Sequence, residues 1–265
     1  MNGAIMAGWS GQLPDEQAGE MLRWYEGLET QVMDFICVVP PHGTHNLNSW
    51  SSQMATVLVE ACCLIESIFH QFKNEAATVQ GKPQPRARLT LGAYAELDSS
   101  RLCLPERTVI LLTDTPTYRT PFALWTDPMG GACFDKHKHV PEWWDLYNRS
   151  KHRRITAFPE FTLTRAVDAL AGALVVISTI PAFAPALLRH EWLPLGGWNP
   201  EMLLESYLNV LSRGKKSPQR RDFTIERQLL AVPILSHSLL PTDISDFRPV
   251  LFGASPRLLR WFRKF

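Results

Sequence analysis

Apolar residues recur at intervals of three and four in two segments near the start of the chain, which is the spacing of one helix face. The first segment runs from Pro14 to Val39, with Asp15 and Glu16 in its first turn, and the second runs from Ser49 to Lys73. The apolar positions are Leu22, Tyr25, Leu28, Val32, Phe35, Ile36 and Val39 in the first and Met54, Val57, Leu58, Ala61, Leu64, Ile65, Ile68, Phe69 and Phe72 in the second. Since only the loop Pro40–Asn48 separates them, we expect two long antiparallel helices.

The middle of the chain predicts a small β-hairpin. A Gly- and Pro-containing stretch, Ala76–Arg86, predicts an exposed loop, and a short helix is expected near Leu89–Leu97. Thr108–Leu112 is apolar and β-branched, and a second short apolar run, Phe122–Trp125, lies beyond the turn residues Asp114–Pro121. Two such runs on either side of a turn are typical of a hairpin.

Two further helices are predicted after Pro141, which is a favourable first helical residue. The first carries Trp143–Arg154, and the second spans Glu160–Ile180, with Leu163, Val167, Leu170, Leu174 and Ile177 on one face. The uncharged run Ala169–Leu188 has about the length of a membrane span, but Pro181 and Pro185 interrupt it. We therefore expect a buried core helix and no membrane segment.

The remainder of the chain has weaker patterning. Pro200–Leu211 predicts a helix, Arg213–Arg221 a basic loop, and Phe223–Leu235 either a strand pair or an irregular wrap. Arg257–Phe265 fits either an amphipathic turn or a mobile basic tail. The predicted fold is mainly α, with an antiparallel helical bundle over residues 14–182, a β-hairpin insertion near 105–126, and a mixed or irregular C-terminal extension over 183–265.

Composition and charge narrow the class of protein. The chain has 265 residues, 45% of them hydrophobic, and a formal net charge of +1, which argues against a disordered or a wholly polybasic protein. The first residues lack a secretory signal. The five cysteines are an odd number without a C-x-x-C pair, which fits neither a disulfide framework nor a zinc ribbon: Cys37, Cys62, Cys63, Cys103 and Cys133. We expect a cytoplasmic protein.

The segment Trp143–Arg154 is the most informative for chemistry. On a helix, Asn148, Lys151 and His152 share one face, with Trp144 and Ile155 on either side. Histidine moves protons near neutral pH, a lysine holds a phosphate, and an asparagine orients either one. The Gly-rich phosphate loop, the G-x-S-x-G elbow and the H-E-x-x-H motif do not occur, so other hydrolases and nucleoside triphosphatases lack support.

These segments resemble the HEPN superfamily, the all-helical nucleotide-binding and ribonuclease domains of prokaryotic toxins, defence proteins and CRISPR effectors, and more closely an uncharacterised bacterial branch. The resemblance covers roughly Leu22–Ile180. It lies in Asn46, Asn48 and Ser51 at a helix start, in Leu58–Glu66, and in the pattern W-W-x-x-Y-N-x-x-K-H from Trp143 to His152. It implies an RNA- or nucleotide-binding protein, a toxin or defence endoribonuclease that needs neither metal nor cofactor, and a homodimer that builds one cleft from two histidine helices.

The strict ribonuclease motif of the superfamily, an arginine four to six residues before the histidine, is absent. Tyr147 stands where the arginine is expected, although Asn148 and His152 match the polar residue and the histidine. Lys151, Arg149 or Arg153 would have to supply the positive charge, and a lysine lacks the bidentate fork of arginine.

A non-catalytic helical interaction module with a protein partner is the alternative function. In that case Trp143, Trp144 and Tyr147 are core or interface aromatics, while Asn148 and His152 hydrogen-bond a buried turn.

Further residues are candidates for supporting roles. Glu66, on the second predicted helix, could pair with Lys151 or favour the protonated form of His152, or it could form an ordinary ion pair. The residues expected to contact RNA are Arg149, Arg153, Arg154, Lys136 and Lys138, and basic clusters also occur at 213–221 and 257–264. Cys133, Asp135, His137 and His139 alternate along the chain, a spacing too wide for one tetrahedral zinc, so we expect no metal site.

Overall fold

The computed structural model describes residues 13–41, 43–79, 102, 104–112, 117–125, 140–193, 199–211 and 223–234. The side chains at 43–44, 73–79, 106, 153–156, 223–224 and 233–234 lie outside this description. The predicted helix near Leu89–Leu97, the basic segment Arg213–Arg221 and the end of the chain at Arg257–Phe265 also fall outside the described residues.

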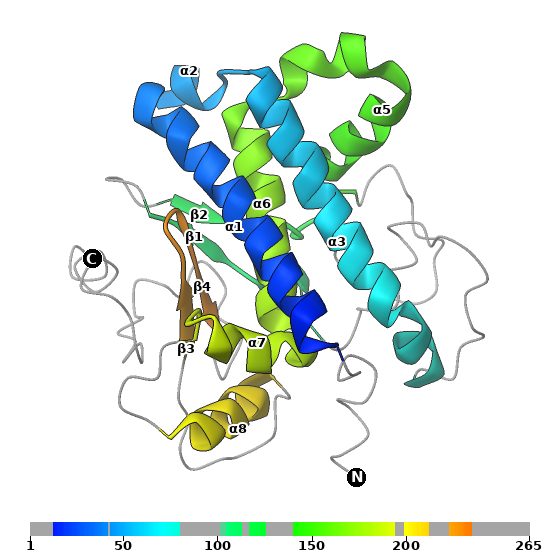
Figure 1. Ribbon diagram of the computed structural model, residues 1–265. Helices are drawn as coiled ribbons and strands as arrows, with labels where there is room; N and C mark the ends of the chain where they lie inside the picture. Colours follow the sequence, from blue (N-terminus) through cyan, green and yellow to red (C-terminus); the bar gives the residue numbers. More distant parts are fainter. Residues whose placement is uncertain are drawn as a thin grey trace.

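Helices make up most of the described chain, together with a small sheet (Figure 1). The α-helices are α1 (Asp15–Val38), α2 (Gly43–Leu47), α3 (Ser52–Val79), α5 (Glu142–Ala157), α6 (Leu163–Thr179), α7 (Ala184–Arg189) and α8 (Pro200–Leu211). The strands are β1 (Val109–Leu111), β2 (Thr117–Arg119), β3 (Phe223–Glu226) and β4 (Leu230–Ile234), and short 3-10 turns occur at η1 (Leu104–Glu106), η2 (Phe158–Glu160) and η3 (Pro181–Phe183). The prediction of a mainly helical fold with a small β element is confirmed.

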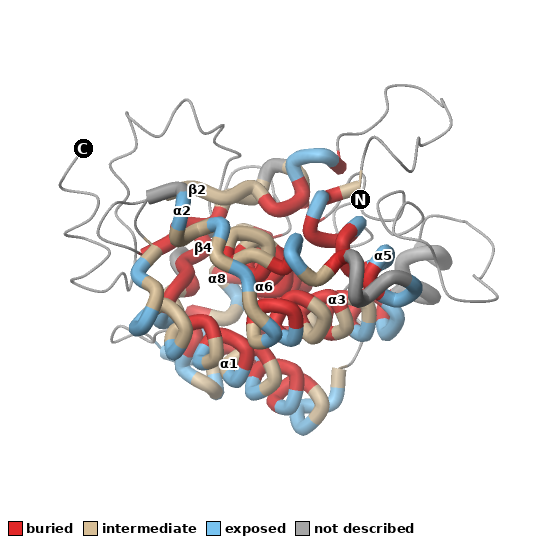
Figure 2. Tube along the Cα trace, turned by 90° about the horizontal axis from the view of Figure 1, so that it is seen from above, coloured by how far each residue is buried: buried red, intermediate tan, exposed pale blue. Residues whose placement is uncertain are grey.

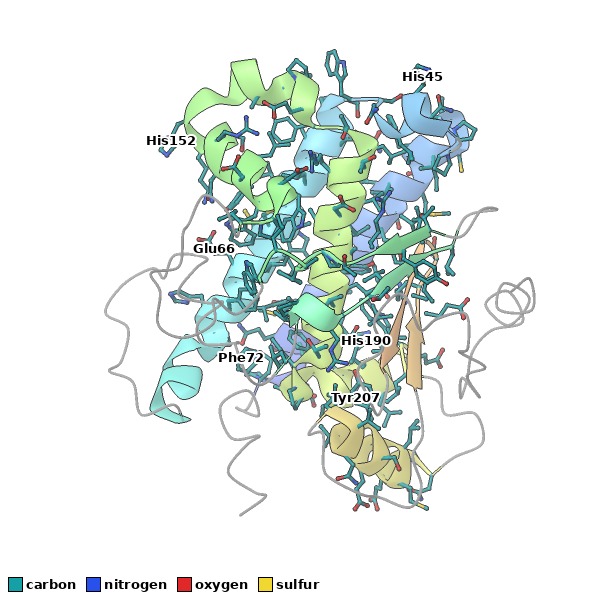
Figure 3. All side chains as sticks on the ribbon, turned by 180° about the vertical axis from the view of Figure 1, so that it is seen from behind. His45, Glu66, Phe72, His152, His190 and Tyr207 are labelled. Carbon is teal, nitrogen blue, oxygen red and sulfur yellow. The ribbon has the colours of Figure 1, made fainter. Side chains whose placement is uncertain are left out.

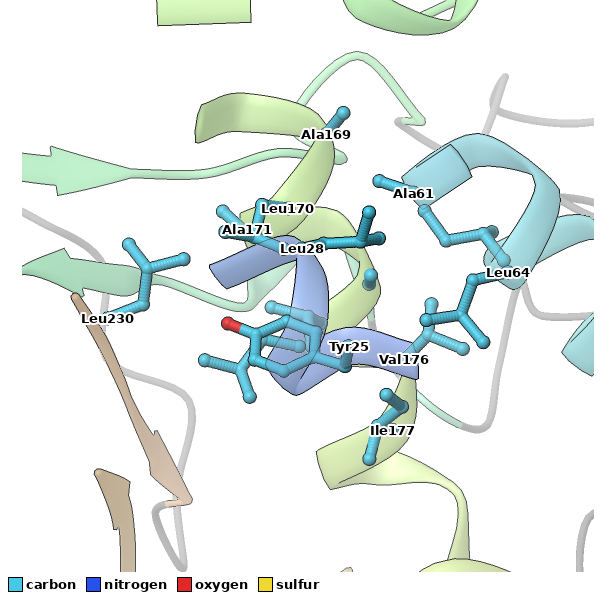
Figure 4. Packing of buried hydrophobic residues seen from close by; sticks show 14 of the residues in the cluster. Tyr25, Leu28, Ala61, Leu64, Ala169, Leu170, Ala171, Val176, Ile177 and Leu230 are labelled. Carbon is cyan, nitrogen blue, oxygen red and sulfur yellow. The ribbon is translucent and has the colours of Figure 1, made fainter. Parts of the chain in front are cut away.

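Helix α6 is the centre of the structure, and 14 of its residues are buried. Figure 2 shows it enclosed by other elements, and the close view in Figure 4 places Tyr25 and Leu28 of α1, Leu64 of α3 and Leu230 of β4 around it. Small residues at 169, 171, 172 and 173 let these neighbours approach its backbone closely. Such a helix is stable only when apolar partners cover it on every side.

Two described segments meet the length and apolarity of a membrane span. They are Ser52–Phe72 of α3, of which 56% is buried against the rest of the protein, and the pair Leu163–Thr179 with Pro181–Arg189, which is bent by 80°. The bend lies where Pro181 was expected to end the helix, and α6 does stop at Thr179. Both segments pack against other parts of the chain in the way of core helices.

The sheet joins two distant parts of the chain. Its strand order is β2-β1-β4-β3, with all neighbours antiparallel, so β4 from the C-terminal part pairs with β1. Of the two alternatives for 223–235, the strand pair is therefore confirmed, with Ile225 opposite Val232. The domain boundary that the sequence suggests between residues 182 and 183 stays a prediction.

One predicted strand is wrong. The first strand of the hairpin is present as β1, but its partner β2 lies at Thr117–Arg119, within the expected turn, while Phe122–Trp125 forms a turn. The Pro121 carbonyl accepts a hydrogen bond from Trp143 Nε1 at 3.1 Å, and both Phe122 and Trp125 are buried in the same core. In a β-strand, residues three positions apart point to opposite faces of the sheet. A strand could therefore not bury both Phe122 and Trp125 in the same core.

The predicted helix boundaries also need small corrections. Helix α3 continues to Val79, beyond the expected end at Lys73 and into the segment predicted as a loop. The loop Pro40–Asn48 contains the short helix α2, and Asn46 Nδ2 donates to the Pro40 carbonyl at 2.8 Å.

A buried charged group fixes the β3–β4 turn to α1. Glu29 is 1% exposed, and its carboxylate accepts a hydrogen bond from the Leu229 amide at 3.0 Å. Arg227 Nη2 lies 3.0 Å from Glu26 Oε1, and its guanidinium stacks 4.2 Å from the centre of the Trp192 ring. Burial raises the pKa of Glu29, and the hydrogen bonds from the turn oppose that shift. The turn thus supplies the partners that a buried carboxylate requires.

Glycine 172 determines how closely α5 approaches α6, and substitutions at two helical glycines test this. A Cβ atom at Gly172 would lie 3.1 Å from Trp143 Cζ2 and 3.4 Å from Ile65 Cδ1, whereas a Cβ atom at exposed Gly27 on α1 would meet nothing within 4 Å. We predict that Gly172→Ala lowers the free energy of unfolding by about 1 kcal/mol, because overpacking outweighs the helix-propensity gain. Gly27→Ala should raise it by about 0.5–1 kcal/mol. Urea denaturation measures both; stabilisation by both substitutions would contradict this packing.

An ion pair connects β2 to α6, and it makes stability depend on pH. Arg119 Nε lies 3.5 Å from Asp168 Oδ1, and burial raises the pKa of Asp168 to about 6, although Arg119 and Arg165 oppose the shift. Because this pKa exceeds the ordinary value near 4, the folded state binds the proton more tightly, and stability falls as pH rises from about 4 to about 6. Between pH 4 and pH 7, the parent should lose about 2 kcal/mol more than Asp168→Asn in urea denaturation. Parallel pH profiles would show that Asp168 titrates normally.

Candidate functional site

The buried face of α5 is aromatic and fixes how the helix is turned. Trp143, Trp144 and Tyr147 are each no more than 4% exposed. Their rings form an edge-to-face series that starts at Phe122, with successive centroids 5.6, 5.6 and 5.5 Å apart. The interpretation of these residues as core aromatics is confirmed, and the opposite face of α5 is turned outward.

The three candidate catalytic residues lie on this outward face. Asn148, Lys151 and His152 are all exposed, as the helical spacing predicted. Figure 3 shows His152 projecting outward from α5, with Glu66 lower down on α3. The alternative that Asn148 and His152 hydrogen-bond a buried turn is therefore wrong, since neither side chain is buried.

A group of four side chains links α3 to α5 beside this face. The Tyr147 hydroxyl donates to Glu66 Oε2 at 2.9 Å and lies 3.5 Å from Cys63 Sγ. Lys151 Nζ is 4.0 Å from Glu66 Oε2 and 3.8 Å from the centre of the Tyr147 ring. The expected pairing of Glu66 with Lys151 is thus present, and a cation–π contact supports it.

The electrostatics of this group make Tyr147 a hydrogen-bond donor rather than a base. Burial raises the pKa of Tyr147, and Cys63 and Glu66 raise it further. The neighbouring Cys62 is fully buried, which raises the pKa of its thiol. Lys151 keeps 37% of its side chain exposed while Glu66 and the Tyr147 ring hold its ammonium in place. This ammonium can contact an anion without leaving its two partners.

Arg149 was expected to be an RNA-binding cation, and the structure places it in an ion-pair cluster. Its two terminal nitrogens each donate to one oxygen of Glu160 at 2.7 Å, and its Nε donates to Asp145 Oδ2 at 2.8 Å. Both carboxylates raise the pKa of Arg149, and Arg149 lowers the pKa of Glu160. A guanidinium carries five N–H donors in one plane, and all three nitrogens of Arg149 donate a hydrogen bond to these two carboxylates.

A cavity of about 230 Å³ lies beside this cluster, at the start of α5 and α6. A second ion pair, between Arg165 and Glu142, also borders it. Its lining residues are Val140, Glu142, Asp145, Leu146, Arg149, Glu160 and Arg165. The sequence did not predict this cluster. The one signal for it is the spacing of four between Asp145 and Arg149, which suits a helical ion pair.

Several sequence candidates lie outside the described residues. Lys136 and Lys138, the alternating Cys133–His139 segment and both C-terminal basic clusters are among them. The backbone of Arg153 and Arg154 belongs to α5, but their side chains are not described. Within the described part of the chain, Cys37, Cys62 and Cys63 are free thiols, and no three His, Cys, Asp or Glu side chains group as a metal site.

The hydrogen bond from Tyr147 to Glu66 gives a test of the α3–α5 contact. Tyr147→Phe keeps the ring over which Lys151 lies and removes only the hydroxyl. We predict a loss of about 1 kcal/mol in the free energy of unfolding, because Glu66 retains Lys151 and water as partners. Urea denaturation measures the loss, and Tyr147→Leu, which also removes the ring, should cost more. Equal stability of Tyr147→Phe and the parent would mean that this hydrogen bond contributes nothing.

Comparison with known proteins identifies no relative of this chain. No protein-family model matches it, and neither a curated protein nor a solved structure does.

Proposed function

We propose that this is a HEPN-like, RNA-binding protein of the toxin or defence type, and that the outward face of α5 contacts the RNA backbone. The observation that carries the proposal is the placement of Lys151. Its ammonium is held by Glu66 and by the Tyr147 ring, and it remains more than one third exposed. A cation fixed in this way loses little side-chain entropy when it binds a phosphate.

His152 and Asn148 extend this proposal to RNA cleavage without metal. Both are exposed on the face that carries Lys151. In such a reaction the ribose 2′-oxygen attacks the adjacent phosphorus, the 2′-hydroxyl proton passes to a base, and the 5′-oxygen leaves with a proton. His152 would transfer the proton, Asn148 would orient the phosphate, and Lys151 would balance the developing charge in place of the missing arginine.

The homodimer and the cytoplasmic location are part of the same proposal. A dimer would bring two α5 helices to one cleft, as the resemblance implies. Trp143 and Trp144 cannot form its contact surface, because they are buried within the chain itself. Exposed residues of α5, such as Asn148 and His152, would have to meet across the interface.

The alternative function, a non-catalytic interaction module, has one observation in its favour. Arg149 is neutralised by Asp145 and Glu160, so the outward face of α5 carries less free positive charge than the sequence suggests. A partner protein that offers hydrogen bonds would suit such a face as well as a polyanion does. The two functions differ in their response to RNA.

Binding and cleavage of single-stranded RNA in metal-free buffer test the proposed function. We predict that the parent protein binds and cuts the RNA and that His152→Gln lowers the cleavage rate by about a hundredfold to ten-thousandfold, the effect of losing a general acid or base. Its melting temperature should stay within a few degrees of the parent's, because His152 is exposed. Lys151→Met should weaken both binding and cleavage.

The control is Arg23→Met, which removes one exposed positive charge from α1. It should leave binding unchanged, and the affinity of the parent should fall steeply as salt rises, because phosphate contacts release counterions. Full cleavage by folded His152→Gln would remove this residue from the mechanism. A parent protein that shows no RNA-dependent signal at low salt would leave the interaction module as the function.

A further inference from the structure

The cavity at the start of α5 and α6 has the charge arrangement of an occupied anion site. Arg149 and Arg165 both border it, each held by carboxylates that also border it. Glu142 and Asp145 lie in the first turn of α5, and Arg165 lies in the first turn of α6. The N-terminus of a helix carries a partial positive charge of about half a unit. The two guanidiniums and the two N-termini therefore balance the three carboxylates.

The contact between Glu160 and Arg149 has the geometry by which arginine binds phosphate. Both terminal nitrogens of Arg149 donate, one to each carboxylate oxygen, at 2.7 Å. Two parallel N–H···O bonds of this kind form equally well with two oxygens of a phosphate. Glu160 thus occupies the position that a phosphate group would take on Arg149.

Exchange of Glu160 for a phosphate is electrostatically balanced. A phosphodiester carries one negative charge, as a carboxylate does, so the charge paired with the Arg149 guanidinium would not change. The side chains of Arg149 and Glu160 are 43% and 49% exposed, and ion pairs this exposed contribute little to stability. The fold therefore does not depend on Glu160 staying bound.

We propose that this cavity is a phosphate subsite for RNA, in which a backbone phosphodiester replaces the Glu160 carboxylate on Arg149. The inference rests on the proposed function, and it adds a regulatory feature, since Glu160 competes with RNA for the same guanidinium. Arg149 then becomes an RNA contact only when RNA is present, and Asp145 keeps its Nε in place during the exchange. The subsite extends the RNA path along α5, because His152 lies three residues, about one helical turn, beyond Arg149.

Removal of the competing carboxylate is the direct test. Glu160→Gln should lower the dissociation constant for single-stranded RNA by about three- to tenfold, and the dependence of affinity on salt should steepen by about one counterion. The matched control is Asp15→Asn. Asp15 pairs with Arg189 at 2.7 Å and is 52% exposed, so its substitution changes the net charge by the same amount at an ion pair outside the cavity. It should leave the affinity unchanged.

A second variant tests the subsite without altering Glu160. Arg149→Lys keeps the charge but loses the two-point contact, so it should raise the dissociation constant at least threefold. The double variant with both substitutions should lose most of the RNA affinity that Glu160→Gln alone gains. Arg149→Lys therefore still tests the subsite if the melting temperature of Glu160→Gln is far below that of the parent.

The outcomes separate this inference from the proposed function. If the parent binds RNA through Lys151, yet neither Glu160→Gln nor Arg149→Lys differs from Asp15→Asn, the subsite is wrong and the proposed function stands. If no variant binds RNA, both are wrong. Inorganic phosphate replaces chloride at equal ionic strength in the last arm. It should weaken RNA binding to Glu160→Gln more than to Arg149→Lys, because it competes for the same guanidinium, and an equal effect on both variants would overturn the phosphate subsite.

Discussion

The whole structure depends on the need to cover α6 on every side. Fourteen of its residues are buried and most of them are apolar, so exposing the helix to water would destabilise the fold by more than any single surface interaction contributes. Helices α1 and α3, the aromatic face of α5 and strand β4 each supply part of the cover. The arrangement of the described candidates on α5 follows from which face this helix turns toward α6.

For α5 this constraint decides which side chains meet solvent. Trp143 fills the space that the missing side chain of Gly172 leaves on α6, and Tyr147 reaches Glu66 on α3. With the aromatic face committed to these contacts, Asn148 and His152 necessarily point outward. Packing and the candidate chemistry are thus connected in one helix, and a change that rotates α5 would disturb both.

The positive charges of Lys151 and Arg149 on α5 differ in their surroundings. Lys151 lies against a tyrosine ring and one carboxylate, so its charge stays partly available to an approaching anion. Arg149 is held by two carboxylates, which neutralise its charge in this structure. This difference follows from geometry, because a guanidinium satisfies two carboxylates at once, while the ammonium of Lys151 lies at the limit of ion-pair distance from Glu66.

The sequence predicted the features that depend on neighbouring residues. The three- and four-residue spacing located α1, α3, α5 and α6, and Pro181 marked the end of α6. Prediction from the sequence failed where distant segments meet. The apolar run Phe122–Trp125 was predicted as a strand but forms a turn against Trp143. No pattern near β1 indicated that β4 would pair with it. The Asp145–Arg149 pair has a helical spacing, whereas Glu160 reaches Arg149 only because η2 turns the chain back.

We propose that RNA binds along the outward face of α5. Photo-crosslinking tests it most directly: the purified protein is irradiated with single-stranded RNA that contains 4-thiouridine, and the attached peptides are mapped by mass spectrometry. We expect crosslinks within the α5 segment from Asn148 to His152, and their loss when unlabelled RNA competes. Crosslinks of equal yield on α1 or α8, or none at a saturating concentration of RNA, would contradict it.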